Sequence, residues 1–583
     1  MSIRPSFRFA GVLVSLVVVA ALWLFWRSTA PPTSALDHAA PAHGGQLTAG
    51  IRADPKSFNS LVAFDEPSVL VSSLLQARLA RINRATFELE PWLAETWEMT
   101  PDGRKYTLHL RRGITWSDGV PLTSADVLFT FRAVTDKRVE SPLADSLVVA
   151  GKPIDVSAPD DHTVVLTFPA PSGPGIRLLD TLPILPKHKL EGALADGTFR
   201  TSWLTTTAPS DIVGAGPFVL KSYATGQRVV LSRNERYWRK SADGMKLPFI
   251  DQLILEIVPE QTAGMVRLEA GNLDLLQSEL RPDDVASALK AEARGNLKVI
   301  ELGVGTDADA FWFCLKPEAR KRDRRFAFVQ RREFRQALSH AVDREEFARI
   351  VFFDAAVPIW GPVTPGNKTW FSPNVRRYPP DLDKARALLR DIGLEDRNGN
   401  GIVEAADGTE ARFTVVTQKG IASYERGTAL LKERAAMIGV QLDIAPLEAG
   451  VMIQKMMASD YEAIYMRPLM TDLDPAGNMD MWLSSGGAHF WNMEQTMPAT
   501  EWEKRIDDIM TRQAATVDLA RRRELFNEVQ EIFAENLPVL YFAAPRLYYA
   551  HSTRITGVLP SVLRPPVLWN ADSLGVTAPP RAN

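Results

Sequence analysis

The stretch that decides the fold is residues 90–131, which read EPWLAETWEMTPDGRKYTLHLRRGITWSDGVPLTSADVLFTF. Residues 101–103, Pro-Asp-Gly, combine a fixed φ, an Asx-type hydrogen bond and tolerance of positive φ, so they predict a tight turn. Residues 105–111 then alternate between polar and apolar side chains, which predicts a half-buried strand. Thr123 and Asp126 have the spacing of a capping box and predict a helix start. These residues are scaffold, and none of them implies catalysis.

The same stretch carries a long motif with many fixed positions. It reads P-x-L-A-x-x-W-x-x-x-x-D-G, then the alternating strand, then D-G-x-P-L-T-S-x-D-V, with Ser124 where alanine is commoner. The whole pattern resembles the signature of the family 5 extracellular solute-binding proteins. These are the oligopeptide-, dipeptide- and nickel-binding receptors of ABC importers.

Further matches follow in the same order along the chain. Residues 214–220 and 229–238 resemble the family's G-T-G-P-Y/F and R-N-x-x-Y-W segments, and the glycines are expected to permit a tight turn. Residues 266–274 predict a helix with a glycine C-cap before a strand. Residues 334–344 resemble the family's F-R-Q-A-L-S-x-A-I-D-R helix, and residues 525–541 its closing helix and strand.

The resemblance covers about residues 45–560. It implies an α/β protein with the two-lobed periplasmic-binding-protein fold (class II, large type with an extra domain), built from mixed sheets flanked by helices. A chain of 583 residues also exceeds the size at which one core keeps growing. The expected boundaries are a cytoplasmic N-terminus (1–8), an apolar helix (9–26), a flexible tether (27–44), lobe I (45–75, 186–275 and 536–583, including the C-terminal tail), the extra domain (76–185) and lobe II (276–535).

Composition narrows the class of protein only a little. Hydrophobic residues make up 45% and charged residues 23%, as in ordinary globular proteins. The net charge of −3 and the absence of a long basic block give no indication of a nucleic-acid partner. Cys314 is the one cysteine, so no intrachain disulfide can form, and between Phe313 and Leu315 it is expected to be a buried small hydrophobe.

The N-terminus predicts export from the cytoplasm. Residues 9–26 are almost entirely apolar, and as a helix they would span about 27 Å. They form either a cleaved signal peptide or a retained anchor, and the Trp-rich end at 23–26 favours the anchor. Arg4 and Arg8 place the rest of the chain outside the cytoplasm. No cysteine follows the apolar run, so no lipid anchor of the lipoprotein type is expected.

Two regions supply the predicted ligand contacts. By the resemblance, the loop at Phe64 and Asp65 faces the ligand cleft, although an exposed loop acid is also expected simply to be solvated. In the family's peptide receptors an aspartate four residues before a D-P proline binds the ligand's α-ammonium. Here Thr471 holds that place, Asp472 follows it, and Asp474 precedes Pro475 as either a contact or a turn residue. The remaining candidates for the cleft wall, each of which has a core residue as its alternative, are Trp482, Trp491 and Asn492.

Residues 396–407 partly match an EF-hand loop. Oxygen donors suited to Ca²⁺ fall at Asp396, Asn398, Asn400, Ile402 (main chain), Glu404 and Asp407, with a glycine at the sixth position. The twelfth position is Asp rather than the bidentate Glu. The alternative is an Asn/Gly-rich hairpin turn. A structural Ca²⁺ is therefore a hypothesis, and no other cofactor is expected.

The function implied by the resemblance is capture of a small solute, peptides being the commonest cargo, by hinge closure and delivery to an ABC permease. Two other classes stay open: a membrane-tethered sensor and an extracytoplasmic hydrolase. Against the hydrolase, the chain contains no H-E-x-x-H, G-x-S-x-G, C-x-x-C or P-loop motif. We therefore expect a monomeric, non-enzymatic, periplasmic binding protein, whose solute the sequence does not identify.

Overall fold

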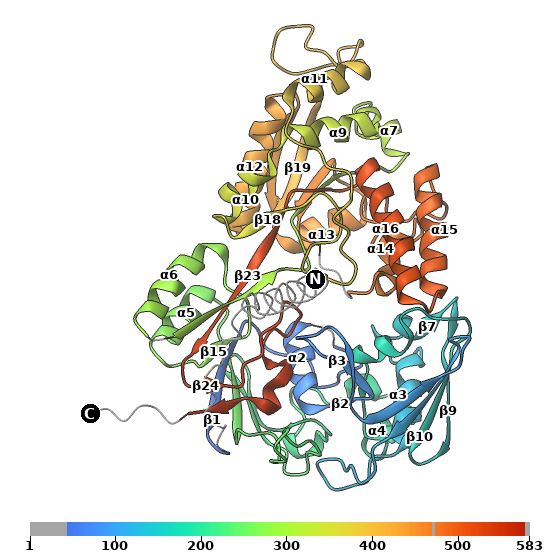
Figure 1. Cartoon of the computed structure of the whole chain (residues 1–583), viewed down its shortest axis with the longest axis vertical. Coiled ribbons are helices and arrows are strands. Elements are labelled where there is room, and N and C mark those ends of the chain that lie inside the picture. The colour runs from blue at the N-terminus through green and yellow to red at the C-terminus, as the bar shows by residue number, and fades with distance from the viewer. Residues whose placement is uncertain (1–42, 64, 296, 469–472, 578–583) are drawn as a thin grey trace, which may run out of the picture.

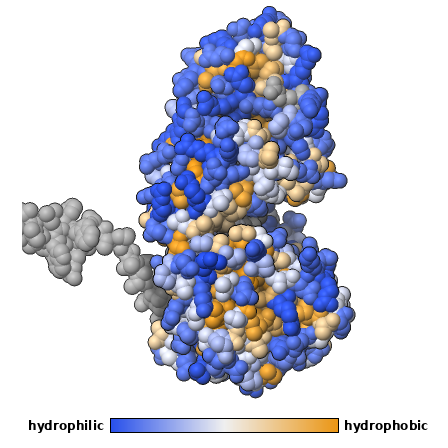
Figure 2. Space-filling model, turned by 90° about the vertical axis from the view of Figure 1, so that its right-hand side faces the viewer, coloured by the Kyte–Doolittle hydropathy of each residue, from blue (hydrophilic) through white to orange (hydrophobic). Residues whose placement is uncertain are grey.

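The computed structural model describes residues 43–63, 65–295, 297–468 and 473–577. They form two lobes, stacked vertically in Figure 1, and Figure 2 shows the molecule narrowing where the lobes meet. Buried residues within 47–297 and 549–574 make up the core of the lower lobe. Those within 308–544 make up the core of the upper lobe.

A mixed sheet forms the base of the lower lobe, in the order β12-β13-β14-β1-β15-β23-β16. β1 runs parallel to its neighbours β14 and β15, whereas β13 and β14 are antiparallel. The strands are β1 (Gln46–Ile51), β12 (Phe218–Ala224), β13 (Arg228–Arg233), β14 (Gln252–Ile257), β15 (Leu275–Leu276), β16 (Leu297–Val304) and β23 (Ala543–Ser552). The α-helices of this lobe that are longer than two turns are α2 (Glu66–Leu75), α3 (Ser124–Thr135), α4 (Lys187–Asp196), α5 (Gln261–Glu269) and α6 (Pro282–Ala293).

The motif of residues 90–131 builds an antiparallel sheet at the side of the lower lobe. Its order is β5 (Ala94–Met99), β6 (Lys105–Leu110), β10 (Thr163–Thr167) and β9 (Asp155–Asp160). The predicted turn is confirmed: Gly103 has φ +67°, and Met99 pairs with Tyr106 across it. The predicted capping box is confirmed as well, at the start of α3 (Ser124–Thr135), where Asp126 accepts a hydrogen bond of 2.9 Å from the Thr123 main-chain N–H.

The upper lobe is a second mixed sheet with helices around it. Its order is β20 (Gln441–Leu447), β19 (Arg412–Gln418), β21 (Ala463–Met466), β17 (Ala310–Phe313) and β22 (Leu540–Tyr541). The helices of more than one turn are α9 (Arg332–Ala341), α10 (Arg344–Phe352), α11 (Leu382–Asp391), α12 (Ala422–Ala436), α13 (Ala449–Met457), α15 (Glu501–Ala515) and α16 (Leu519–Asn536). Cys314 is buried in this core.

Two of the predicted boundaries of lobe II need correction. Residues 276–304 carry α6 and β16, which pack in the lower lobe, because β16 pairs with β23 at the edge of the large sheet. Residues 536–544 instead belong to the upper lobe, because β22 pairs with β17 there and the side chains of β22 join the core of that lobe. The chain therefore passes between the lobes near residue 305 and again near residue 545, and not at 276 and 536.

The strand β23 belongs to both lobes. Residues 543–545 pair with β18 (Ala356–Pro358), and residues 546–552 pair with β16. In β16 the register shifts between Glu301 and Gly303, and Gly303 has φ +100°. A β-bulge bends the strand that carries it. Bulge and shared strand together mark the hinge between the lobes.

The lobes also touch away from this hinge. The main-chain N–H of Gly173, in the lower lobe, donates a hydrogen bond of 2.6 Å to the Ala514 carbonyl at the end of α15. In Figure 1, β23 lies on the left of the molecule and α15 on the right. We call the Gly173–Ala514 contact the rim contact.

None of the helices in the described part of the chain combines the length and the apolar composition needed to cross a bilayer. Residues 1–42, which hold the predicted apolar helix, lie outside that part.

Candidate functional site

Cavities lie between the lobes and in the adjoining face of the lower lobe, and four of them share Arg564. The cleft cavity, about 240 Å³, includes Arg84, Asp180, Asn367, Trp482, Phe526 and Arg564. The hinge cavity, about 390 Å³, includes Arg52, Gln277, Glu279, Ser423, Arg467, Arg546 and Arg564. The lower-lobe cavity, about 480 Å³, includes Ser60, Leu70, Gln76, Arg78, Trp92, Trp569 and Arg564. A fourth, much smaller one includes Glu279, Thr306, Asp307 and Arg564.

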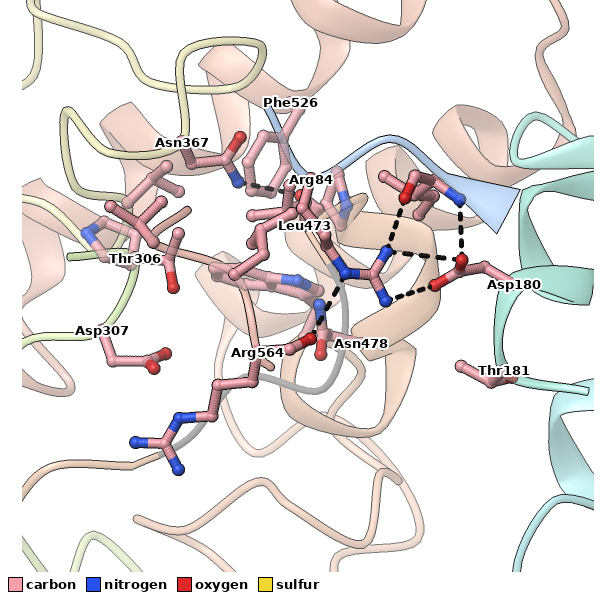
Figure 3. A pocket seen from close by; sticks show the side chains of 17 residues that line it. Arg84, Asp180, Thr181, Thr306, Asp307, Asn367, Leu473, Asn478, Phe526 and Arg564 are labelled. Carbon is pink, nitrogen blue, oxygen red and sulfur yellow. Dashed lines mark hydrogen bonds and ion pairs between the residues drawn. The ribbon is translucent and has the colours of Figure 1, made fainter. Parts of the chain in front are cut away.

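The walls of the cleft cavity come from both lobes (Figure 3). Arg84 and Asp180 come from the lower lobe, and Asn367 and Phe526 come from the upper lobe. Arg564 lies in the segment that follows β23. A pocket walled by two bodies that meet at a hinge changes shape when they move, which is the arrangement that couples binding to closure.

Arg84 and Asp180 form the lower wall as a two-pronged ion pair. The Nη2–Oδ2 and Nη1–Oδ1 distances are 3.0 and 3.3 Å, and the Ile82 N–H donates to the same carboxylate at 2.7 Å. Arg84 Nε also donates to the Arg564 carbonyl at 3.3 Å. Burial disfavours the charged carboxylate, but the positive charges of Arg84 and Arg78 outweigh it and lower the pKa of Asp180. This pair is a fixed, ionised part of the wall.

Arg564 is held at the junction of the cavities by acids from the lower lobe. Its Nη2 lies 2.9 Å from Glu279, its Nη1 lies 3.7 Å from Glu66, and its side chain is half exposed. Burial opposes the charge on the guanidinium, yet Glu279 and Glu66 outweigh it and raise the pKa of Arg564. The group therefore stays cationic, with surface left over for an anionic partner.

A second cation faces the hinge cavity from the upper lobe. Arg467 pairs with the fully buried Asp309 at 2.8 Å, and Tyr465 donates to the same carboxylate at 2.9 Å. Burial disfavours the charge of Arg467, but Asp309 outweighs it and raises the pKa of the arginine. The cavities between the lobes thus have arginines on both sides.

The upper wall of the cleft cavity contains buried polar atoms that the described residues do not satisfy. Asn367 donates from Nδ2 to the Leu473 carbonyl at 2.9 Å, while its Oδ1 has no partner. The indole N–H of Trp482 is likewise without a partner among the described residues. Buried polar groups normally find a partner, so both atoms are candidates for contact with a solute or with water.

The family is settled by a match over most of the chain. The model for "Bacterial extracellular solute-binding proteins, family 5 Middle" matches residues 88–490. The chain is a family 5 extracellular solute-binding protein. The resemblance carried by residues 90–131 and the predicted two-lobed α/β fold are thereby confirmed.

Relatives match the family 5 protein over most of their own length. A "Probable ABC transporter-binding protein" of Deinococcus radiodurans is 25% identical over 547 residues, which cover 88% of this chain and 89% of the relative. The "Dipeptide-binding protein" of Escherichia coli is 26% identical over 520 residues, covering 86% and 87%. The crystal structure of the ABC transporter substrate-binding protein CtaP from Listeria monocytogenes has a TM-score of 0.75 at 25% identity, covering 92% of this chain and 100% of that one.

The predicted ligand residues of the family 5 protein fall in different places. Phe64, Thr471 and Asp472 lie outside the described residues. Asp65 is the N-cap of α2, where it accepts from the Ser68 N–H at 3.1 Å, and it is in none of the four cavity walls named above. Trp482 does line the cleft cavity.

Asp474 lies beneath the cleft wall, paired with an arginine. Its two carboxylate oxygens lie 2.5 and 2.7 Å from the guanidinium of Arg522, and both side chains are 3% exposed. Asp474 also accepts from the Ala476 N–H at 3.0 Å as the cap of the short helix that follows. The geometry is that of the turn-residue alternative, with an ion pair that the sequence did not indicate.

Trp491 and Asn492 lie in the interior of the upper lobe. Trp491 packs edge-on against Phe533 of α16. Asn492 donates to Gln495 and is 4% exposed. Neither lines any of the four cavities described above, which corresponds to the core alternative for these two residues.

Side-chain oxygens of the predicted calcium loop accept hydrogen bonds or form ion pairs within the protein itself. Asp396 accepts from the N–H groups of Gly399 and Gly401 at 2.7 and 2.9 Å. The carbonyl groups of the Asn398 and Asn400 side chains accept from N–H groups two residues on, at Asn400 and Ile402. Glu404 accepts from the Arg397 N–H, and Asp407 pairs with Arg324. Across the described residues no group of three or more His, Cys, Asp or Glu side chains could hold a metal ion. A bound Ca²⁺ stays a prediction.

Sequence reasoning missed the charged residues that define the cavities, namely Arg84, Asp180, Arg467 and Arg564. Arg564 stands before two prolines in an irregular segment, and Arg84 stands in a turn between β3 (Ala80–Ile82) and β4 (Leu89–Pro91). Neither position has a periodicity or a motif that separates it from a solvated surface arginine. Only the three-dimensional arrangement identifies them.

Proposed function

We propose that this family 5 protein is the extracytoplasmic receptor of an ABC importer, which encloses a small solute between its lobes and hands it to a membrane permease. The observation that carries the proposal is the set of cavities around Arg564, walled by both lobes next to the shared strand β23. We further propose that the protein acts as a monomer and that, as expected of a solute-binding protein, it leaves the solute chemically unchanged.

For the solute, we propose a peptide or another small molecule that carries a carboxylate. The arginines around the cavities supply positive charge that the described acids only partly surround, and the guanidinium fork suits a carboxylate. The Escherichia coli relative is named for dipeptide binding, which supports a peptide. The α-ammonium contact of the peptide receptors is replaced here by Thr471, so a peptide would be held in another way at that end.

Closure would bend the hinge at β16 and β23. A solute that contacts Arg84 and Asp180 below and Asn367 and Trp482 above makes its full set of contacts only when the lobes are together. A ligand shifts such an equilibrium by its difference in affinity for the two states. The permease would then recognise the closed arrangement.

Native mass spectrometry of the protein purified from its host is expected to show an additional mass in the range of a small solute. The released compound, returned at ~100 Kd, should raise the free energy of unfolding by about 2.7 kcal/mol. Arg564→Gln should weaken this binding by about tenfold or more, because a charged hydrogen bond is lost. The exposed Arg112→Gln is the matched control and should bind as the wild type does. A protein that carries no solute and responds to no peptide, sugar or chelate pool would contradict the proposal, as would conversion of the solute into a product.

We also propose that the N-terminal apolar helix, residues 9–26, is retained and anchors the receptor to the membrane. The aromatic residues at its end and the two preceding arginines support an anchor facing outward. The intact mass of the protein from washed membranes should then include residues 1–44. A mature N-terminus that begins beyond residue 27, or release of the protein into the soluble fraction of broken cells, would contradict retention.

A further inference from the structure

The lower-lobe cavity has apolar walls and a volume typical of small-molecule sites. It measures about 480 Å³, within the range of about 300–1,000 Å³ for ligand pockets. Its apolar lining includes Leu70 and Leu74 of α2, Trp92, Tyr237, Leu568 and Trp569. The cavity lies in the lower lobe, and of the predicted ligand residues that the structure describes, Asp65, Asp474, Trp482, Trp491 and Asn492, none lines it.

Four buried polar atoms along this cavity have no hydrogen-bond partner among the described residues. They are Ser60 Oγ, Gln76 Oε1, Arg78 Nε and Gln277 Oε1. Gln76 and Gln277 are 3% and 5% exposed, and the Gln76 side chain donates from Nε2 to the Val213 carbonyl at 3.2 Å while its Oε1 has no described partner. Leaving one such atom unsatisfied in the interior is unfavourable. Four such atoms in one cavity indicate that a group other than the described residues completes them.

Arg78 differs from the other arginines in this wall. Arg84 pairs with Asp180, Arg564 pairs with Glu279, and Arg81 pairs with Glu90 while stacking 3.6 Å from the Trp92 ring centre. No hydrogen bond or ion pair within 4 Å joins Arg78 to an acid of the described chain; Asp180 acts on it only at longer range. Burial lowers the pKa of Arg78 to about 10, so the guanidinium still carries its charge at neutral pH.

The lower-lobe cavity adjoins the cleft cavity. Ile82, Arg84, Asp180, Thr181 and Arg564 line both the lower-lobe cavity and the cleft cavity. A solute between the lobes therefore lies next to the lower-lobe cavity, with the Arg84–Asp180 pair in the wall that the two cavities share.

From this geometry we infer that the lower-lobe cavity receives an aromatic or aliphatic group of the solute that bears a carboxylate and an N–H or O–H donor, with Arg78 as the counter-ion of the carboxylate. The inference rests on the proposed function. The carboxylate would meet the unpaired guanidinium, the donor would meet the amide oxygens of Gln76 and Gln277, and the apolar body would fill the walls. The two acceptor oxygens argue against a phosphate, which brings only further acceptors at neutral pH.

N-acetyl-L-phenylalanine has this chemistry, and N-acetyl-L-phenylalaninamide is its uncharged isostere. In calorimetric titration of the full chain in mild detergent, the acid is expected to bind at least about tenfold more tightly than the amide. Arg78→Gln should remove this difference by weakening the acid about tenfold or more, while Arg112→Gln leaves it unchanged. Equal affinity of acid and amide, an acid affinity unaltered by Arg78→Gln, or no binding of either probe to the wild type at millimolar concentration would each overturn the inference.

Ser60→Val keeps the test decisive if Arg78→Gln fails to fold. The substitution removes an unpaired hydroxyl and narrows the lower-lobe cavity, so the melting temperature should not fall, whereas the acid should bind several-fold more weakly. Unchanged binding of the acid to this variant would overturn the inference.

Failure of the receptor function would give a different experimental result. If the released solute stabilises the wild type and Arg78→Gln equally, only the inference about the lower-lobe cavity is overturned. If the purified protein carries no solute, only the receptor function is overturned, and the titration with the two probes still tests the cavity.

Discussion

Asp474→Ala is expected to lower the free energy of unfolding by about 3–5 kcal/mol, because it strands the charge of Arg522 in the interior. The two side chains are 3% exposed and joined at 2.5 and 2.7 Å. Arg522 also donates to the main-chain carbonyl and to the side-chain carbonyl of Gln513, which are neutral and cannot compensate the charge. Loss of the cap on the Ala476 N–H adds to the effect. Denaturant unfolding, followed by a probe in the upper lobe, measures the change.

The double variant Asp474→Leu with Arg522→Met tests whether the loss of stability comes from the unpaired charge of Arg522. Replacing a buried pair by apolar residues of similar size is often close to neutral, so most of the lost stability should return. The exposed Asp508→Ala, on α15, should change the free energy of unfolding by no more than about 0.5 kcal/mol. If Asp474→Ala instead kept full stability and abolished solute binding, Asp474 would be a ligand contact, as the sequence alternative had it, and not a structural residue.

Gly214→Ala is expected to cost at least about 3 kcal/mol of folding free energy or to prevent folding. A Cβ at this position would overlap the Leu75 carbonyl oxygen, with the carbonyl carbon at 2.9 Å. These are main-chain atoms at the end of α2 and cannot rotate away as a side chain would. At Gly216 a Cβ would lie 2.5 Å from the Leu74 oxygen, and its N–H donates to the Leu75 carbonyl at 2.9 Å. The G-x-G pair therefore lets two segments of main chain touch.

Gly192→Ala is the matched control, because this glycine lies inside α4 with open space around the new Cβ. It should stabilise the protein by up to about 1 kcal/mol through helix propensity. Thermal and denaturant unfolding of Gly214→Ala and Gly192→Ala measure the two changes in stability. Comparable stability of Gly214→Ala and the wild type would show that the 214–216 segment moves away from α2 at little cost.

The motif at 214–216 shows how far sequence reasoning reaches. Its family resemblance is confirmed and the chain bends at residues 215–217, but a tight turn alone does not explain the two glycines. Neither glycine has positive φ, and what they permit is close approach to α2. The turn at 101–103 and the capping box at Thr123 were predicted with the right reason. Their hydrogen bonds join residues two to five positions apart, so the sequence contains the whole interaction.

The candidate site lacked any such local signal. Arg84 donates to the main chain of Arg564, 480 positions later, and pairs with Asp180, 96 positions later. Trp482 and Trp491 are close in sequence and nearly equally buried, yet one lines the cleft and the other packs inside the lobe. Residue type and spacing do not distinguish such cases, because the difference is made by which distant segment lies opposite.

The rim contact has a consequence for how the protein exchanges its cargo. On one side the lobes are joined by continuous chain through β23, and on the other they meet at the Gly173–Ala514 hydrogen bond. A hydrogen bond of this kind is worth about 0.5–1.5 kcal/mol net. This contact alone stabilises the closed arrangement only weakly, so the lobes of the empty receptor should open and close repeatedly before a solute binds. The bound solute has to supply most of the free energy that holds the lobes together.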